Sequence, residues 1–406
     1  MRFGSRIAGL LRAGAIGLAA TLMPLWACAA PLSVTGGDTA SATVMTTKAP
    51  KALLIDDRSG TVLLSKDADK PVPPASLAKL MTAEVVFEAL DKGDITLQTP
   101  YTVSEYAWRT GGAPSGTSTM FARIKSTATV ADLLQGMIVQ AANDGAIILA
   151  EGLAGSEQAF AQRMNERAHQ LGLTGSVFVN ATGLPAPGQA VTLDDLVTLA
   201  RHIHSAYPQY YKFYSQPAFT WNNIMQRNRN PLLRLGIGAD GMGTGYTQAS
   251  GYALVGSAEQ NGRRLFLAMS GLASIKDREE EARKLIQWGM TAFDDTRLYA
   301  ANDVVGEAQV FGGAEGAVPL KVKDDVEVLL PKEGRDKLKA RIVYTGPVRA
   351  PVARDTQIGT LRLQLNGTTL REVPVFAAKA VDKGSMSQRA WGAAMELSTG
   401  WLRRYL

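Results

Sequence analysis

The sequence predicts an α/β domain with an antiparallel sheet, followed by a smaller all-β domain. Strand-like runs lie near both ends of residues 48–297, with helical periodicity between them, which is the pattern of a sheet covered by helices. After about residue 300, short β-like runs follow one another between Gly, Pro and Asp turns. A length of 406 residues is sufficient for about two domains.

The composition excludes several classes of protein. Hydrophobic residues make up 46% of the chain and charged residues 20%, so neither a disordered chain nor a multispan membrane protein fits. Lys and Arg number 43 against 37 Asp and Glu, and Arg2, Arg6 and Arg12 precede the first acidic residue. The small remaining excess of positive charge does not indicate a nucleic-acid partner. Because the chain has one cysteine, Cys28, and only three histidines, we expect no metal site and no cofactor.

The first 29 residues have the three parts of a secretory signal peptide. Basic residues precede a mostly apolar run at residues 13–26, and Ala27 and Ala29 flank Cys28 in an Ala-x-Ala pattern. We expect cleavage after Ala29 and export across the inner membrane of a bacterium. One alternative is an N-terminal membrane helix, although the run is shorter than the roughly 20 residues that a span needs. The other is a lipoprotein in which Cys28 carries the lipid.

The elements of the α/β domain follow from periodicity and turn signals. Residues 30–47 are rich in Thr, Ser, Ala and Gly and indicate a linker. We expect a hairpin of Lys51–Asp57 and Thr61–Lys66, and strands at Tyr252–Ala258 and Leu265–Gly271 around an Asn261-Gly262 turn. Apolar residues at helical spacing predict helices at Ser76–Asp91, Val130–Leu153, Ser156–Leu171, Thr192–Ser205 and Asp277–Phe293.

The all-β domain is predicted at residues 300–378. Its expected strands are Val304–Phe311, Ala317–Val322, Val326–Leu330, Leu338–Val343, Gln357–Leu365 and Thr368–Val375. Residues 385–406 form an amphipathic pattern, with Trp391, Trp401 and Tyr405 on an apolar half and arginines opposite. This predicts a helix that lies in a membrane interface, because the stretch is too short and too charged to span. The alternative is a helix packed against its own β domain.

The chemistry lies in Ser76-Leu77-Ala78-Lys79. A serine at the start of a helix with lysine three residues later places the hydroxyl and the amine on one face of the first turn. Lysine can accept the proton of such a serine when burial lowers its pKa. The spacing alone is weak, since an N-cap serine with a solvated lysine produces it too. Here the tetrapeptide follows Pro-Pro-Ala and opens an apolar helix, which favours the catalytic interpretation.

Residues 74–83 resemble the active-site segment of low-molecular-mass penicillin-binding proteins, the serine-type D-Ala-D-Ala carboxypeptidases. Further segments resemble that family in the same order: Leu133-Leu134-Gln135-Gly136-Met137 before Ala141-Ala142-Asn143-Asp144, Phe178-Val179-Asn180 before Gly183-Leu184, and Asp240-Gly241-Met242-Gly243-Thr244-Gly245-Tyr246-Thr247 before Gly251-Tyr252. The resemblance covers most of the chain after the predicted signal peptide. It implies a penicillin-binding/β-lactamase-like transpeptidase fold, with a second all-β domain and a C-terminal amphipathic helix.

The resemblance also implies a site and a reaction. Ser76 would attack the carbonyl between two D-alanines of a peptidoglycan stem peptide, and Lys79 would accept its proton. Asn143 would bind the substrate amide or orient Lys79, and Thr244 and Gly245 would contribute to substrate binding. β-Lactams would be covalent inhibitors. The protein would be periplasmic and attached peripherally to the outer face of the inner membrane through its C-terminal helix.

Two positions depart from the family pattern: Ala141 stands where the family has serine, and Gly243 stands where it has lysine. The lost charge-assisted bond costs about 1.5–3 kcal/mol, roughly 10–100-fold in rate, and a lost proton relay about 10²–10⁴-fold. Losing the nucleophile can cost about 10⁶-fold, so we expect a slow enzyme. Arg227 or Arg229 is a candidate replacement for the lysine. The main alternative is a non-catalytic protein that binds peptidoglycan or an envelope partner; a β-lactamase is a minor one.

Overall fold

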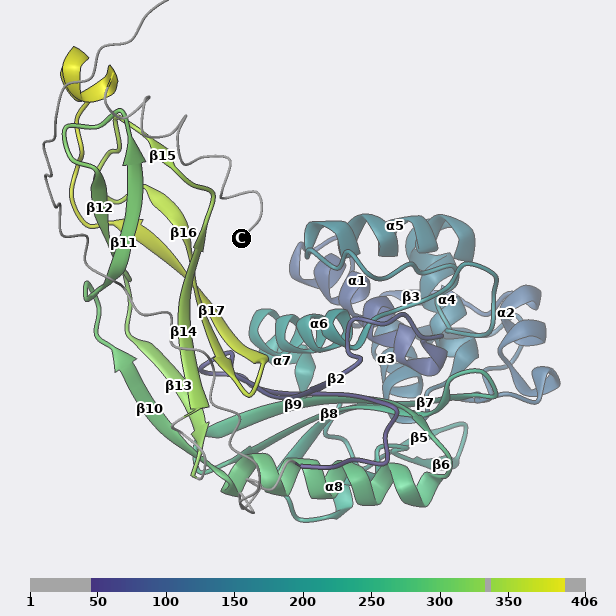
Figure 1. Ribbon diagram of the computed structural model, residues 1–406. Coiled ribbons are helices and arrows are strands. Elements are labelled where there is room, and N and C mark those ends of the chain that lie inside the picture. Colours follow the sequence, from purple (N-terminus) through teal and green to yellow (C-terminus); the bar gives the residue numbers. More distant parts are fainter. Residues whose placement is uncertain (1–44, 333–336, 391–406) are drawn as a thin grey trace, which may run out of the picture. The chain divides into compact units, whose positions relative to one another are not determined.

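The computed structural model describes residues 45–332 and 337–390 (Figure 1). The predicted signal peptide, residues 1–29, lies outside the described residues, as does most of the linker. Of the predicted C-terminal helix only residues 385–390 are described, and residues 386–390 are helical.

A five-stranded antiparallel sheet with the order β2-β1-β9-β8-β7 forms the centre of the α/β domain. Its strands are β1 (Lys51–Asp56), β2 (Val62–Lys66), β7 (Ala239–Thr247), β8 (Gly251–Gln260) and β9 (Arg263–Leu272). The predicted hairpin and the predicted pair of later strands are confirmed. Asn261 and Gly262 both have positive φ in the turn between β8 and β9, as a two-residue hairpin turn of type I′ requires. Strand β7 is at the edge of this sheet.

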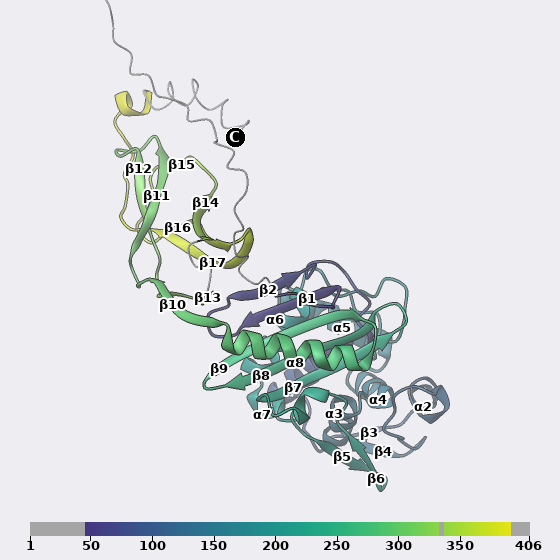
Figure 2. The same cartoon turned by 60° about the horizontal axis from the view of Figure 1, so that its bottom comes forward.

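Helices cover both faces of the sheet (Figures 1 and 2). Helix α6 (Leu193–Ala206) packs on β1 and β9 from one side, and α8 (Ile275–Thr291) packs on β8 and β9 from the other. Helices α1 (Lys79–Asp91) and α5 (Glu157–Gln170) lie on the α6 side. The helix predicted at Asp277–Phe293 corresponds to α8, and its predicted end was wrong by two residues, because Phe293 begins strand β10. The largest fully buried side chains of the domain include Phe87, Phe160 and Phe266.

The remaining elements of the α/β domain are short. They are the 3-10 helices η1 (Ala75–Ala78), η2 (Ala113–Ser115) and η3 (Pro231–Arg234), helices α2 (Glu105–Thr110) and α7 (Pro208–Tyr211), and the strand pairs β3 (Pro100–Thr102) with β4 (Thr127–Thr129) and β5 (Ala218–Trp221) with β6 (Ile224–Arg227).

The single helix predicted over Val130–Leu153 was wrong. Two helices occupy this segment, α3 (Val130–Val139) and α4 (Asn143–Ala154). The chain turns between them at Ala141, which has a left-handed φ of 57°. Periodicity could not reveal the break because both halves are apolar and share one spacing. Tertiary contacts cause it: the backbone N–H of Asn143 donates to the Ser118 carbonyl at 2.7 Å instead of continuing the α3 ladder.

The C-terminal part is all-β with a core of its own. A six-stranded sheet has the order β14-β16-β17-β12-β11-β15, and β10 pairs with β13. The strands are β10 (Phe293–Tyr299), β11 (Val304–Phe311), β12 (Ala317–Lys321), β13 (Val326–Pro331), β14 (Leu338–Tyr344), β15 (Val348–Arg349), β16 (Gln357–Leu365) and β17 (Thr368–Ala377). The six strands expected here are present, whereas β10 and β15 had not been expected.

Candidate active site

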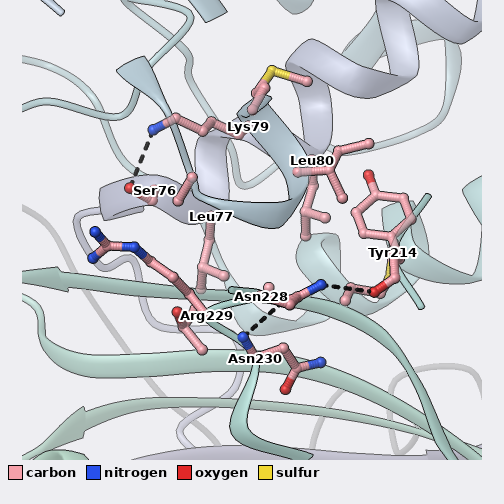
Figure 3. A pocket seen from close by; sticks show the side chains of 14 residues that line it. Ser76, Leu77, Lys79, Leu80, Tyr214, Asn228, Arg229 and Asn230 are labelled. Atoms are coloured by element: carbon pink, nitrogen blue, oxygen red, sulfur yellow. Dashed lines mark hydrogen bonds between the residues drawn. The ribbon is translucent and has the colours of Figure 1, made fainter. Parts of the chain in front are cut away.

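Ser76 and Lys79 meet at the junction of η1 and α1. Ser76 lies within the 3-10 turn, and Lys79 is the first residue of α1. Nζ of Lys79 donates to Oγ of Ser76 at 3.1 Å, as Figure 3 shows. The side chain of Ser76 is half-buried, whereas Lys79 is only 5% exposed. The predicted face-to-face placement of hydroxyl and amine is therefore present in the structure.

The environment of Lys79 favours its neutral form. Burial, which is the largest effect, and the positive charge of Arg229 together lower the pKa of Lys79 to about 7. Glu157 and Asp144 oppose this shift. An amine with a pKa near 7 can accept a proton from a neighbouring hydroxyl at neutral pH.

Asn143 connects Lys79 to the opposite wall of the site. Its Oδ1 accepts from Nζ of Lys79 at 2.7 Å, and its Nδ2 donates to Oγ1 of Thr117 at 2.9 Å. The adjacent Asp144 is fully buried and accepts hydrogen bonds from the 119–122 segment, which fixes the start of α4. Asn143 is thus held by both of its amide atoms.

The carbonyl of Thr182 is a third acceptor for Lys79, at 2.6 Å. Sequence analysis did not single out this residue, although it lies between two segments that carry the resemblance. The sequence signal that could have pointed to this loop was the glycine that follows Thr182. Gly183 has φ of +80°, and a Cβ there would lie 1.7 Å from the carbonyl oxygen of Ala75. Only glycine allows this loop to approach η1 so closely.

Strand β7 forms the other side of the site. Thr244 is 9% exposed and lines the same cavity as Ser76. A Cβ at Gly245 would lie 3.0 Å from the Cβ of Ala75, so glycine lets β7 pack closely against η1. Gly243 differs, because a Cβ there would meet nothing within 4 Å. All six residues singled out for the site, namely Ser76, Lys79, Asn143, Gly243, Thr244 and Gly245, lie in this region.

Of the two candidate cations, the structure brings Arg229 to the site and leaves Arg227 outside it. Arg229 lines both cavities that adjoin Ser76, and in Figure 3 its guanidinium points to the same side as the polar ends of Ser76 and Lys79. Its backbone N–H donates to the Val139 carbonyl at 3.0 Å. Arg227 is exposed at the end of β6 and lines neither cavity.

Two cavities meet at Ser76. One, of ≈ 360 Å³, lies between the α4 start, the 182–184 loop and the end of β7, and Asn143, Thr182 and Tyr246 line it. The other, of ≈ 30 Å³, lies between η1, α1, α3 and β7, and Ala141 and Gly243 line it (Figure 3). A substrate that reaches across Ser76 therefore has space on both sides of the nucleophile.

Within residues 45–332 and 337–390, no three His, Cys, Asp or Glu side chains gather as a metal ion would require. In the same part of the chain, no helix is both long and apolar enough to cross a membrane.

Comparison with known proteins agrees with this geometry. The sequence model of D-alanyl-D-alanine carboxypeptidases matches residues 38–272, and that of the penicillin-binding protein 5 C-terminal domain matches residues 293–383. D-alanyl-D-alanine carboxypeptidase DacC of Escherichia coli is 36% identical over 371 residues, 89% of this chain and 93% of that protein. D-alanyl-D-alanine carboxypeptidase DacD of Escherichia coli is 34% identical over 83% of this chain and 88% of its own length.

Solved structures show the same likeness. Penicillin-binding protein 5 from Haemophilus influenzae matches with a TM-score of 0.68 and 34% identity, over 84% of this chain and 99% of that one. Penicillin-binding protein D2 from Listeria monocytogenes, in its ampicillin-bound form, matches with a TM-score of 0.53 and 30% identity, over 61% of this chain and 100% of that one.

Proposed function

The chain belongs to the D-alanyl-D-alanine carboxypeptidase family, and we propose that Ser76 is the nucleophile with which it removes the terminal D-Ala from peptidoglycan stem peptides. The protein is a serine-type D-Ala-D-Ala carboxypeptidase. The observation that carries the assignment of Ser76 is the buried amine of Lys79, which has a lowered pKa and lies 3.1 Å from the Ser76 hydroxyl.

The reaction proceeds through an acyl-enzyme. Oγ of Ser76 bonds to the carbonyl carbon between the two D-alanines, and its proton passes to Nζ of Lys79. The amide C–N bond breaks, and the leaving amine takes that proton. Water then hydrolyses the ester and restores the hydroxyl. Backbone N–H groups of Ser76 and Tyr246 hold the oxyanion, an assignment supported by the position of both residues beside the larger cavity.

Arg229 and Thr244 bind the carboxylate of the terminal residue. Both residues line the smaller cavity beside Ser76. Arg229 supplies the positive charge that a lysine at position 243 would supply, and Thr244 donates a hydrogen bond. Because neither group restores the missing hydroxyl at Ala141, turnover is slower than in a site with serine there, by up to the 10²–10⁴-fold worth of general acid–base assistance.

A fluorescent penicillin tests this assignment. The purified protein is incubated with excess label, and the mass of the adduct and its peptide are determined. We expect slow covalent labelling at Ser76, abolished in Ser76→Ala and retained in Ser205→Ala, an exposed serine on α6. Absence of an adduct after prolonged incubation would instead support the alternative, a non-catalytic protein that binds peptidoglycan, which Ala141 and Gly243 favour.

The same proposal includes a location. The pattern of residues 1–29 supports export to the periplasm, where peptidoglycan stem peptides occur. The amphipathic pattern of residues 385–406 supports peripheral attachment to the outer face of the inner membrane. Most of that segment lies outside the described residues.

A further inference from the structure

The smaller cavity beside Ser76 has room for atoms that a D-Ala substrate does not supply. Its volume is ≈ 30 Å³, whereas about 10–15 Å³ is enough for one water. Ser76 and Lys79 form one end of it, and Leu80 and Tyr214 form the other (Figure 3). The cavity therefore begins at the reacting groups and extends away from them.

The space exists because position 243 carries no side chain. A Cβ there would meet nothing within 4 Å. The backbone does not require glycine at this position, because Gly243 is absent from the residues with positive φ. Gly245 and Gly183 differ, since a Cβ at either would press against η1. Neither a turn nor close packing therefore requires glycine at position 243, and its missing side chain leaves space in the cavity. The small side chain of Ala141, which also lines the cavity, leaves further space there.

One part of the wall of this cavity is apolar, and Tyr214, Asn228 and Asn230 add polar groups to the rest. Met137 and Ile138 come from α3, Met242 comes from β7, and each is at most 9% exposed. Charged groups at the cavity are confined to the end near Lys79 and Arg229. The apolar part suits an unbranched, uncharged side chain, because burying a charged one there would cost free energy.

The proposed binding of the carboxylate decides which part of the substrate faces this cavity. Thr244 lines this cavity and not the larger one, whereas Arg229 lines both, and the carboxylate that they bind belongs to the leaving residue. The acyl part then lies on the other side of Ser76, in the larger cavity with Asn143 and Tyr246. The side chain of the leaving residue is therefore the group nearest to Gly243.

We propose that this cavity is a subsite for the side chain of the leaving residue, and that the enzyme releases terminal D-amino acids with unbranched apolar side chains longer than that of D-Ala. This inference rests on the proposed function of Ser76. Each buried methylene favours binding by about fourfold. D-Norvaline adds two methylenes to D-Ala, so we expect its release to be favoured by about fifteenfold in kcat/KM.

The experiment compares acyl-D-Ala-D-X substrates in which X is Ala, norvaline, methionine or glutamate. Released amino acids are quantified, and penicillin labelling is measured on the same preparation. We expect the wild type to prefer D-norvaline and D-methionine over D-Ala and to release D-glutamate poorly. Gly243→Val fills the cavity and should shift the preference to D-Ala by tenfold or more. Gly316→Val is the matched control, because Gly316 is exposed in the β domain and its Cβ would also meet nothing within 4 Å.

Each outcome decides between the proposals. A wild-type preference for D-Ala that Gly243→Val leaves unchanged would overturn the subsite while keeping Ser76 as the nucleophile. No release from any substrate and no penicillin adduct would overturn the proposed function itself. If the adduct forms without measurable release, protection against labelling is compared for the D-norvaline and D-Ala peptides, and equal protection overturns the subsite.

Discussion

Nζ of Lys79 lies 2.7 Å from Oδ1 of Asn143, and this contact joins two segments 64 residues apart. The same nitrogen also contacts the Thr182 carbonyl and the Ser76 hydroxyl. A neutral amine retains two N–H groups, which the Asn143 and Thr182 oxygens accept, so its lone pair is left facing Ser76. The geometry thus orients the base toward the nucleophile once the proton is lost.

The rate of acylation should depend on the protonation of Lys79. The pKa of this lysine is lowered to about 7 by burial, so the neutral, proton-accepting form predominates above that pH. We expect the rate of penicillin acylation to rise about tenfold per pH unit below pH 7 and to level off above it. Stopped labelling reactions between pH 5 and 9 measure this profile. A rate that falls on raising the pH through 7 would contradict the role of Lys79 as the base.

Removal of the Arg229 charge should change two properties together. In Arg229→Gln, the loss of a charge-assisted bond to the carboxylate lowers kcat/KM by roughly 10–100-fold. Because Arg229 lowers the pKa of Lys79, the midpoint of the pH profile should also move to higher pH. Arg227→Gln is the matched control and should change neither property, since Arg227 is exposed outside both cavities. Equal effects of the two variants would exclude Arg229 as the specific cation.

Restoring both missing side chains should accelerate the enzyme. The double variant Ala141→Ser plus Gly243→Lys supplies a hydroxyl and an ammonium group, and we expect turnover of a D-Ala-D-Ala peptide to rise about tenfold or more. Position 243 has the space for a side chain. Single variants measured alongside show whether the two groups act together. A double variant no faster than the parent would mean that the site has diverged elsewhere.

Local sequence signals were sufficient to predict those helices and strands whose boundaries coincide with a turn motif or with a change in hydrophobic periodicity. The Asn261-Gly262 turn marks a hairpin that the structure contains, and the apolar spacing after Ser76 marks α1. The break at Ala141, where φ is 57°, carried no such signal, because the backbone N–H of Asn143 bonds to the carbonyl of Ser118 in a distant loop. Positions set by tertiary contacts cannot be inferred from periodicity alone.

The same distinction applies to the active site. Spacing placed Ser76 beside Lys79, because one helical turn determines that distance. The choice between Arg227 and Arg229 depended on where the chain runs after β6, because two residues separate a side chain that lines both cavities at Ser76 from one that lines neither. The carbonyl of Thr182 is a backbone acceptor, and its side-chain identity carried no information about that role.

Membrane attachment should depend on residues after Gly384. Residues 378–406 contain five basic and two acidic residues, which favours an anionic leaflet, and their sequence pattern predicts an apolar helical face with two tryptophans that favours the interface. We expect the mature protein to sediment with membranes at low salt and to become soluble when residues 385–406 are deleted. Replacing Trp391 and Trp401 with glutamate should release it as well, whereas replacing two exposed residues of the β domain, Lys339 and Arg341, should not. Full-length mature protein found entirely in the soluble periplasmic fraction at low salt would contradict the anchor.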